Sequence, residues 1–201
     1  MRQCFFLSSS SLLLFFFLIL QQNPSLINAV EPNLVDKTCK KCINSTVSYN
    51  FCLTSLQAVP ISNYSNLPGL ALIAMELGIK NCTTTISTIK KLIGSKYFDR
   101  QSLEDCLELY SDASVVLGDS IRAFLSGLYE SVIRWLSGTM VAATACEDQF
   151  LVAGNPSPLT KENYSLIQLT DIAICITKLI SQGLVSKPVT TLSDGRQVRE
   201  I

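Results

Sequence analysis

The chain has 201 residues, with 16 basic and 16 acidic side chains and no histidine. The absence of histidine excludes the usual general base, the Ser-His and Cys-His nucleophile pairs and the commonest zinc ligand. Because the charges balance, the chain has no excess positive charge to attract a nucleic acid or an anionic membrane surface.

Residues 1–29 have the pattern of a secretory signal peptide. Arg2 supplies a positive start, residues 12–20 form an unbroken apolar run, and Ala29 is a small residue suited to cleavage. The run is too short and wrongly flanked for a stable membrane span, with a signal anchor as the alternative. No later stretch reads as long and apolar enough to cross a bilayer, so we expect a secreted protein without a membrane segment.

Cleavage after residue 29 leaves a chain of a size typical of one domain. We predict a domain at residues 30–186 and a polar, disordered tail at residues 187–201. Removal of Arg2 from the 16 basic residues leaves 15 against 16 acidic ones, a net charge of about −1. Removal of Cys4 from the eight cysteines leaves seven, so at least one is a free thiol or forms an intermolecular bond.

Two short helices are expected between residues 33 and 56, joined near residues 44–48, where polar and β-branched residues favour a turn. Helices this short are marginal alone in water and need a crosslink. Cys39 or Cys42 is well placed to pair with Cys52, and the sequence leaves that choice open. The Cys39-x-x-Cys42 spacing also occurs in redox and zinc sites, but no βαβ setting or second ligand pair accompanies it. We therefore interpret these cysteines as structural.

After a loop at residues 59–66, a long apolar stripe predicts a bundle helix over residues 70–93, ended by Gly94. The stripe advances in alternating steps of three and four: Leu72, Met75, Ile79, Cys82, Ile86, Ile89 and Ile93. Cys82 within this stripe and Cys175 in the last helix are both expected to behave as small buried hydrophobic side chains, and a disulfide between them is the alternative.

Residues 102–150 contain two helical patterns back to back. A Ser102-x-x-Asp105 capping pattern predicts the start of the first helix, and the second runs from residue 128 to residue 150. The turn between them is expected at Ser126-Gly127, where a glycine interrupts the apolar period.

Cys106 and Cys146 are placed symmetrically about that turn, since each lies 20 residues from Ser126. Positions equidistant from the turn of an antiparallel helix pair stand at the same height. The two sulfur atoms are therefore expected to meet across the pair.

The last helix is expected to begin near Thr160, after the break at residues 154–158, and to end at Gly183. Its apolar stripe is widened by neighbouring positions, so this helix should lie deepest: Leu166, Leu169, Ile172, Ala173, Cys175, Ile176, Leu179 and Ile180. No stretch alternates like a strand. The elements together predict an all-α fold, an up-and-down four-helix bundle with an N-terminal α-helical hairpin stapled by disulfides.

Carboxylate pairs are the one set of side chains that suggests acid–base chemistry of the glycosidase type: Glu104, Asp105, Glu108, Glu147 and Asp148. Glu104 and Asp105 lie in an initial helical turn, where the helix dipole favours acidic residues, and Glu147 and Asp148 suit a solvated helix surface. We therefore predict no catalytic residue, no cofactor and no metal site.

Four Asn-x-Ser/Thr sequons agree with passage through the secretory route: Asn44, Asn63, Asn81 and Asn163. Such triplets often arise by chance, so we expect about half of them to carry sugar.

Five segments resemble the plant invertase inhibitor and pectin methylesterase inhibitor family: LVDKTCKKC, YNFCLTSL, LEDCLELYSDA, TACEDQF and SPLTKENYSLIQLTDIAICITKLI. The resemblance covers about residues 33–184. It implies a four-helix bundle with an N-terminal hairpin and two disulfides, one inside the hairpin and one between the second and third bundle helices.

The disulfide between bundle helices maps onto Cys106 and Cys146. For the hairpin, the family's leading cysteine follows a threonine, as Cys39 follows Thr38, so the resemblance implies Cys39–Cys52. The states of the three cysteines outside the family pattern are left open: Cys42, Cys82 and Cys175.

Members of this family form one-to-one complexes with plant cell-wall enzymes and block the substrate cleft. The resemblance therefore implies a secreted inhibitor in the apoplast, and we favour pectin methylesterase over acid invertase as its partner. The rival from another class is a helical binding module without inhibitory activity, holding a small apolar ligand inside the bundle. The residues of the partner-binding surface are not assigned.

Overall fold

The structure, a computed structural model, describes residues 33–185. Across that range the chain forms helices and no β-strand. The helices are α2 (Leu34–Cys42), α3 (Tyr49–Gln57), the 3₁₀ helix η2 (Pro60–Tyr64), α4 (Leu67–Ile93), α5 (Arg100–Leu125), α6 (Tyr129–Val152) and α7 (Thr160–Val185). The proposed signal peptide and polar tail lie outside the described residues.

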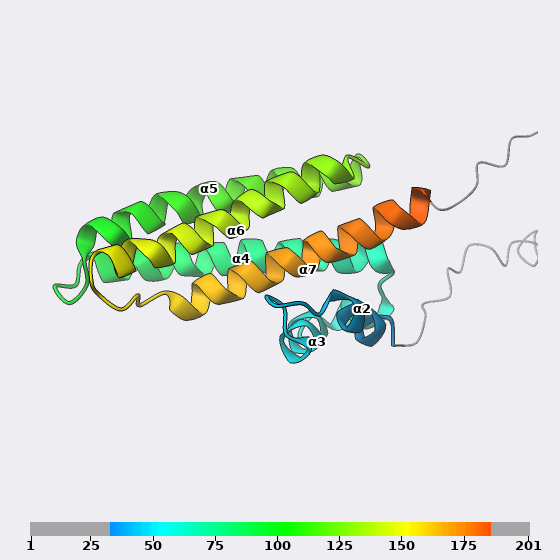
Figure 1. The fold of residues 1–201 in the computed structure, drawn as a ribbon, viewed down its shortest axis with the longest axis horizontal. Helices are drawn as coiled ribbons and strands as arrows, with labels where there is room; N and C mark the ends of the chain where they lie inside the picture. The colour runs from blue at the N-terminus through cyan, green and yellow to red at the C-terminus, as the bar shows by residue number, and fades with distance from the viewer. Residues whose placement is uncertain (1–32, 186–201) are drawn as a thin grey trace, which may run out of the picture. The chain divides into compact units, whose positions relative to one another are not determined.

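The four long helices form an up-and-down bundle in which α4 and α6 each pack between α5 and α7. Figure 1 shows successive helices running in opposite directions, with the short helices α2 and α3 beside α7. The predicted all-α fold, a four-helix bundle with an N-terminal hairpin, is therefore confirmed.

Side chains of the turn residues shape the hairpin between α2 and α3. Asn44 Oδ1 accepts the backbone N–H groups of Thr46 at 2.7 Å and Val47 at 2.8 Å. Ser48 caps α3 by accepting the N–H of Phe51, which satisfies one of the free donors of the first turn. A disulfide joins Cys39 to Cys52, so the two short helices are crosslinked and also closed by their own turn.

Cys42 and Cys175 form a further disulfide, which ties the hairpin to the bundle. The expectation that Cys175 is a buried free thiol or a partner of Cys82 is therefore wrong. The bridge forms because α2 lies against α7, where Asn44 Nδ2 also donates to Asp171 Oδ2 at 2.9 Å. Cys82 is free and buried, and burial raises the pKa of its thiol to about 12, so it stays neutral.

The buried face of α4 is shifted around the helix relative to the predicted apolar stripe. Met75, Cys82 and Ile89 are buried as expected, but the other predicted positions are half-buried: Leu72, Ile79, Ile86 and Ile93. The other buried positions of α4 lie outside the predicted stripe, and most carry small side chains: Leu70, Ala71, Ile73, Ala74, Gly78 and Thr85. A Cβ atom at Gly78 would stand 3.3 Å from two methyl groups of Leu117 on α5. The glycine therefore lets α4 and α5 approach closely.

Several helix boundaries differ from the prediction by a few residues, and two of them have a local physical reason. Helix α5 begins at Arg100, and Asp99 is its N-cap, accepting the Ser102 N–H at 2.7 Å. Ser102 is buried instead, and its Oγ donates to the backbone carbonyl of Gln149 on α6. Helix α7 continues beyond Gly183 to Val185 because an exposed glycine inside a helix costs only about 1 kcal/mol and does not force an end.

Helix α7 is buried around much of its circumference, as predicted, because both the bundle and the hairpin cover it. Its segment Thr160–Gly183 is long and apolar enough to cross a membrane, with a mean hydropathy of 1.3. The expectation that no stretch after the signal peptide meets this criterion is therefore wrong. Half of the apolar window is buried inside the protein, which is typical of a core helix.

Gly78→Leu should destabilise the bundle by about 1–3 kcal/mol, because the new side chain would collide with Leu117. Gly118→Leu is the matched control, since a Cβ there meets no atom within 4 Å and leucine favours a helix. Thermal unfolding of both variants checks this. Equal melting temperatures for the two variants would contradict the close approach of α4 and α5.

The hydrogen bond from the Ser102 backbone N–H holds the pKa of the Asp99 carboxyl below its ordinary value of 3.8. Because the pKa is lower in the folded chain, the charged Asp99 carboxylate stabilises the fold fully at pH values above 3.8. This stabilisation is lost as the pH falls through the lowered pKa. Asp99→Ala should therefore lower stability at neutral pH, with the difference from the natural chain shrinking in acid. Asp99→Asn, a cap that does not titrate, should keep its effect at low pH in denaturant titrations.

Candidate partner-binding surface

The acidic residues at the start of α5 are engaged in local contacts on the surface. Glu104 pairs with Arg100 at 2.8 Å, and Asp105 accepts from Gln101 Nε2 at 2.8 Å, each four residues apart along the helix. Such pairs stabilise the first turns of a helix by a few tenths of a kcal/mol. Glu108, one turn further on, is exposed.

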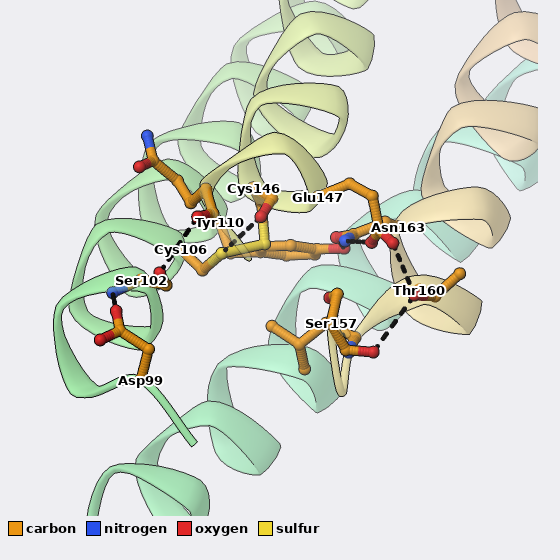
Figure 2. Close-up of a disulfide and its surroundings, with 11 residues drawn as sticks. Asp99, Ser102, Cys106, Tyr110, Cys146, Glu147, Ser157, Thr160 and Asn163 are labelled. Carbon is orange, nitrogen blue, oxygen red and sulfur yellow. Dashed lines mark hydrogen bonds between the residues drawn. A yellow bond between two sulfur atoms is a disulfide. The ribbon is translucent and has the colours of Figure 1, made fainter. Parts of the chain in front are cut away.

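Glu147 has a structural role that the sequence did not reveal. Its Oε2 accepts from Asn163 Nδ2 at 2.6 Å, and its Oε1 accepts from Thr160 Oγ1 at 2.6 Å. Asn163 Oδ1 in turn accepts from the Tyr110 hydroxyl at 2.8 Å. Figure 2 shows this chain of side chains beside the disulfide of Cys106. The network joins α5, α6 and α7, so Glu147 holds helices together.

Tyr110 and Asn163 make this network a buried one. Burial raises the pKa of the Tyr110 hydroxyl far above its ordinary value, so the phenol stays protonated and remains a donor. Asn163 is 2% exposed, and both ends of its amide are hydrogen-bonded. Asp148, the neighbour of Glu147, points away from the network and lines a groove on the outer side of α6. The two acidic residues predicted as a pair therefore face different surroundings.

The cysteines expected at the end of the α5–α6 pair are joined in the structure as Cys106–Cys146. Cys39 and Cys42, the two members of the CxxC spacing, belong to separate disulfides, so they form neither a redox pair nor half of a zinc site. Within residues 33–185, no group of three or more acidic or cysteine side chains is placed to hold a metal ion.

A groove of about 290 Å³ runs along the seam between α5 and α6. We define the α5–α6 face as this groove together with the exposed valines beside it: Asp112, Ala113, Val115, Val116, Arg134, Trp135, Gly138, Thr139, Val141 and Ala142. Val141 also lines the groove on the outer side of α6, so the apolar surface continues across that helix.

Trp135 gives the α5–α6 face the character of a protein-binding surface. It is the only tryptophan of the chain and is 39% exposed. Val115 and Val141 are also exposed in the central turns of their helices, while Asp112 and Arg134 bring opposite charges to the groove. Binding hot spots favour tryptophan and arginine within an apolar centre bordered by polar groups. An open surface of this kind suits a protein partner.

The α5–α6 face is held rigidly at both ends. Gly127 adopts a left-handed φ of 75°, which forms the tight turn that joins the helices, and the Cys106–Cys146 disulfide crosslinks them at the other end. In contrast, the groove between α4 and α7 is lined by lysines and polar side chains such as Lys80, Asn81 and Lys161. We therefore take the α5–α6 face as the candidate functional site.

Glu147→Ala should cost about 1–3 kcal/mol of stability, because it leaves the buried amide of Asn163 without its acceptor. Asp148→Ala is the matched control on the same helix and should change stability by less than about 0.5 kcal/mol. Denaturant unfolding of both variants measures the difference. A Glu147→Ala variant as stable as the natural chain would rule out the structural role of the network.

Comparison with known proteins places the chain among inhibitors. Residues 33–176 match the profile of the family described as plant invertase/pectin methylesterase inhibitor. A Platanus orientalis protein named "Putative invertase inhibitor" is 36% identical over 156 residues, 75% of this chain and 92% of that protein. An Actinidia deliciosa protein named pectinesterase inhibitor is 29% identical over 164 residues, 80% of this chain and 85% of that protein.

The fold also matches a solved structure. A mutant form of a pectin methylesterase inhibitor from Arabidopsis superposes with a TM-score of 0.62 at 20% identity, covering 72% of this chain and 95% of that one. At this identity the likeness shows the shared helical fold. The family profile and the 36% identical relative carry the assignment. The chain belongs to the plant invertase/pectin methylesterase inhibitor family.

Proposed function

We propose that this chain is a secreted inhibitor that binds pectin methylesterase one to one and blocks its substrate cleft in the plant cell wall. The single observation that carries the mode of action is the rigid α5–α6 face, in whose groove Trp135 is 39% exposed. The Actinidia relative named pectinesterase inhibitor, matched over 80% of this chain, supports the choice of target.

Secretion is part of the proposal, with a mature domain at residues 30–186. The signal-peptide pattern of residues 1–29 supports it, as do three disulfides, which form and persist in oxidising compartments. We also propose that the chain is itself no enzyme. Glu147 is committed to binding Thr160 and Asn163, and Glu104 is paired on the surface of α5.

Rigidity is what makes the α5–α6 face suitable for inhibition. A surface already fixed in its bound shape loses little conformational entropy on association, so more of the contact energy appears as affinity. The turn at Gly127 and the Cys106–Cys146 bridge fix the spacing of the two helices. Trp135 then acts as the anchor that enters the enzyme's cleft.

Acid invertase is the second candidate target. The Platanus relative, whose name refers to invertase, has the higher identity at 36%. An Arabidopsis thaliana relative named "Cell wall / vacuolar inhibitor of fructosidase 2" is 29% identical over 113 residues, 55% of this chain. Both enzymes must therefore be tested side by side.

A binding module without inhibitory activity is less well supported. A broad apolar surface such as that of α7 could hold an internal ligand if part of it were left unpacked. That surface is used in packing, because Leu166, Ile172 and Ile176 are fully buried between the bundle helices and the hairpin.

Titration of the purified, disulfide-bonded chain against pectin methylesterase and acid invertase tests the proposal. At mildly acidic pH and micromolar inhibitor we expect loss of pectin methylesterase activity at a one-to-one ratio. Trp135→Ala should weaken inhibition by at least about 30-fold, the loss of a hot spot worth about 2 kcal/mol. Tyr97→Ala is the control, since Tyr97 is 92% exposed in the α4–α5 connection, away from the face.

The possible results test the target enzyme and the binding surface independently. Inhibition of invertase alone would replace the proposed target, and inhibition of neither enzyme would refute the function. Full inhibition by a folded Trp135→Ala variant would refute the α5–α6 face while leaving the inhibitor function intact.

A further inference from the structure

We propose that Asn63 is the N-glycan acceptor of the folded protein, that Asn81 and Asn163 are unmodified, and that the glycan leaves the α5–α6 face clear. The four sequons are equivalent in sequence, but the fold places their side chains in very different surroundings. The proposal rests on the proposed secretion, because the glycan is added in the secretory route.

Asn63 lies in the 3₁₀ helix η2, between the hairpin and α4. Its side chain is exposed, and its amide makes no hydrogen bond to any residue within 33–185. The preceding residue, Ser62, is 1% exposed, so η2 buries one side and turns Asn63 to solvent. A sugar on the Asn63 amide therefore displaces no packed atom and breaks no described contact.

Asn163 has the opposite surroundings. Its amide nitrogen donates to Glu147 and its oxygen accepts from Tyr110, at the buried junction shown in Figure 2. A sugar ring on this nitrogen would need space between α6 and α7 that the packed helices do not leave. A chain with a glycan at Asn163 therefore cannot form the native network, and the sequon there is a structural asparagine.

Asn81 and Asn44 are held by other contacts. Asn81 lies in the middle of α4, where its amide donates to the Glu162 carbonyl of α7 and its Oδ1 is buried. A glycan on this nitrogen would compete with the hydrogen bond that joins α4 to α7 at Asn81. Asn44 is exposed, but its side chain is fixed between the hairpin turn and Asp171 of α7. Asn63 is thus the sequon with the fewest contacts to lose.

The modification requires a polyprenyl-diphosphate-linked oligosaccharide as the co-reactant. The Asn63 amide nitrogen forms a bond to C1 of the first sugar, while the bond from C1 to the diphosphate oxygen breaks. The polyprenyl diphosphate leaves with the electron pair of that bond, and the amide nitrogen releases one proton. No oxidation or reduction takes place.

The position of Asn63 separates the glycan from the proposed inhibitory surface. The 3₁₀ helix η2 packs against α2, α3 and α4. In Figure 1 the α2–α3 hairpin lies beside α7, while α5 and α6 lie on the side of the bundle away from it. A flexible oligosaccharide at Asn63 therefore shields the hairpin side and leaves Trp135 accessible.

Secretion of the full chain from cultured plant cells, followed by intact mass measurement before and after endoglycosidase treatment, tests the proposal. Asn63→Gln should lose the mass of one glycan. Ser165→Ala, which removes the Asn163 sequon without touching the network, should keep the full glycan mass and the melting temperature. Peptide mapping after deglycosylation in ¹⁸O water should mark Asn63 and leave Asn81 and Asn163 unmarked.

Wild-type protein secreted without a glycan, an Asn63→Gln variant of unchanged glycan mass, or a mark at Asn81 or Asn163 would each overturn the acceptor assignment. Asn63→Gln should inhibit the target enzyme as strongly as wild type, and a tenfold change in a folded variant would overturn the separation of the two surfaces. Glycan mass is read independently of inhibition, so failure of the inhibitor function remains distinguishable.

Discussion

The fixed spacing of α5 and α6 is the constraint on which the rest of the structure depends. The helices are joined by a turn that needs a left-handed residue at Gly127 and are crosslinked at their far end by Cys106–Cys146. A disulfide closing a loop of this length typically contributes about 2–4 kcal/mol by restricting the unfolded chain. With these two ends fixed, the pair offers one inner surface to α4 and α7 and one outer surface to solvent.

The inner surface of this pair packs against the other helices, and the outer surface is exposed to solvent. On the inner surface, Leu117 of α5 packs against Gly78 of α4. Hydrogen bonds from Tyr110 to Asn163 and from Asn163 to Glu147 join α7 to the pair. The Cys42–Cys175 bridge then attaches the hairpin to α7, on the side away from α5 and α6. Because the packing and the buried polar contacts lie on the inner side of the pair, the outer α5–α6 face can expose a large aromatic side chain without weakening the core.

Sequence predicted the features that depend on local spacing. The helices follow from apolar periodicity, and Cys106–Cys146 follows from symmetry about a glycine turn. Cys42–Cys175 depends on which distant helices touch, which one sequence does not reveal. The predicted buried face of α4 lies to one side of the observed one. Gly78 and Thr85 are buried because they are small, and a search for large apolar residues does not include them. The role of Glu147 was missed because its partners come from the next helix, whereas a local pattern shows only its acidic neighbour.

Hydroxyl-radical footprinting of the complex with pectin methylesterase tests the central claim most directly, because it asks whether the α5–α6 face itself meets the enzyme. Trp135 is the reporter, and the exposed aromatic rings of Tyr64 and Tyr97 are internal references away from that face. If the face binds, oxidation of Trp135 falls severalfold in the complex while both tyrosines react as in the free chain. Unchanged oxidation of Trp135 in a formed complex, or protection of Tyr64 instead, would contradict the assignment.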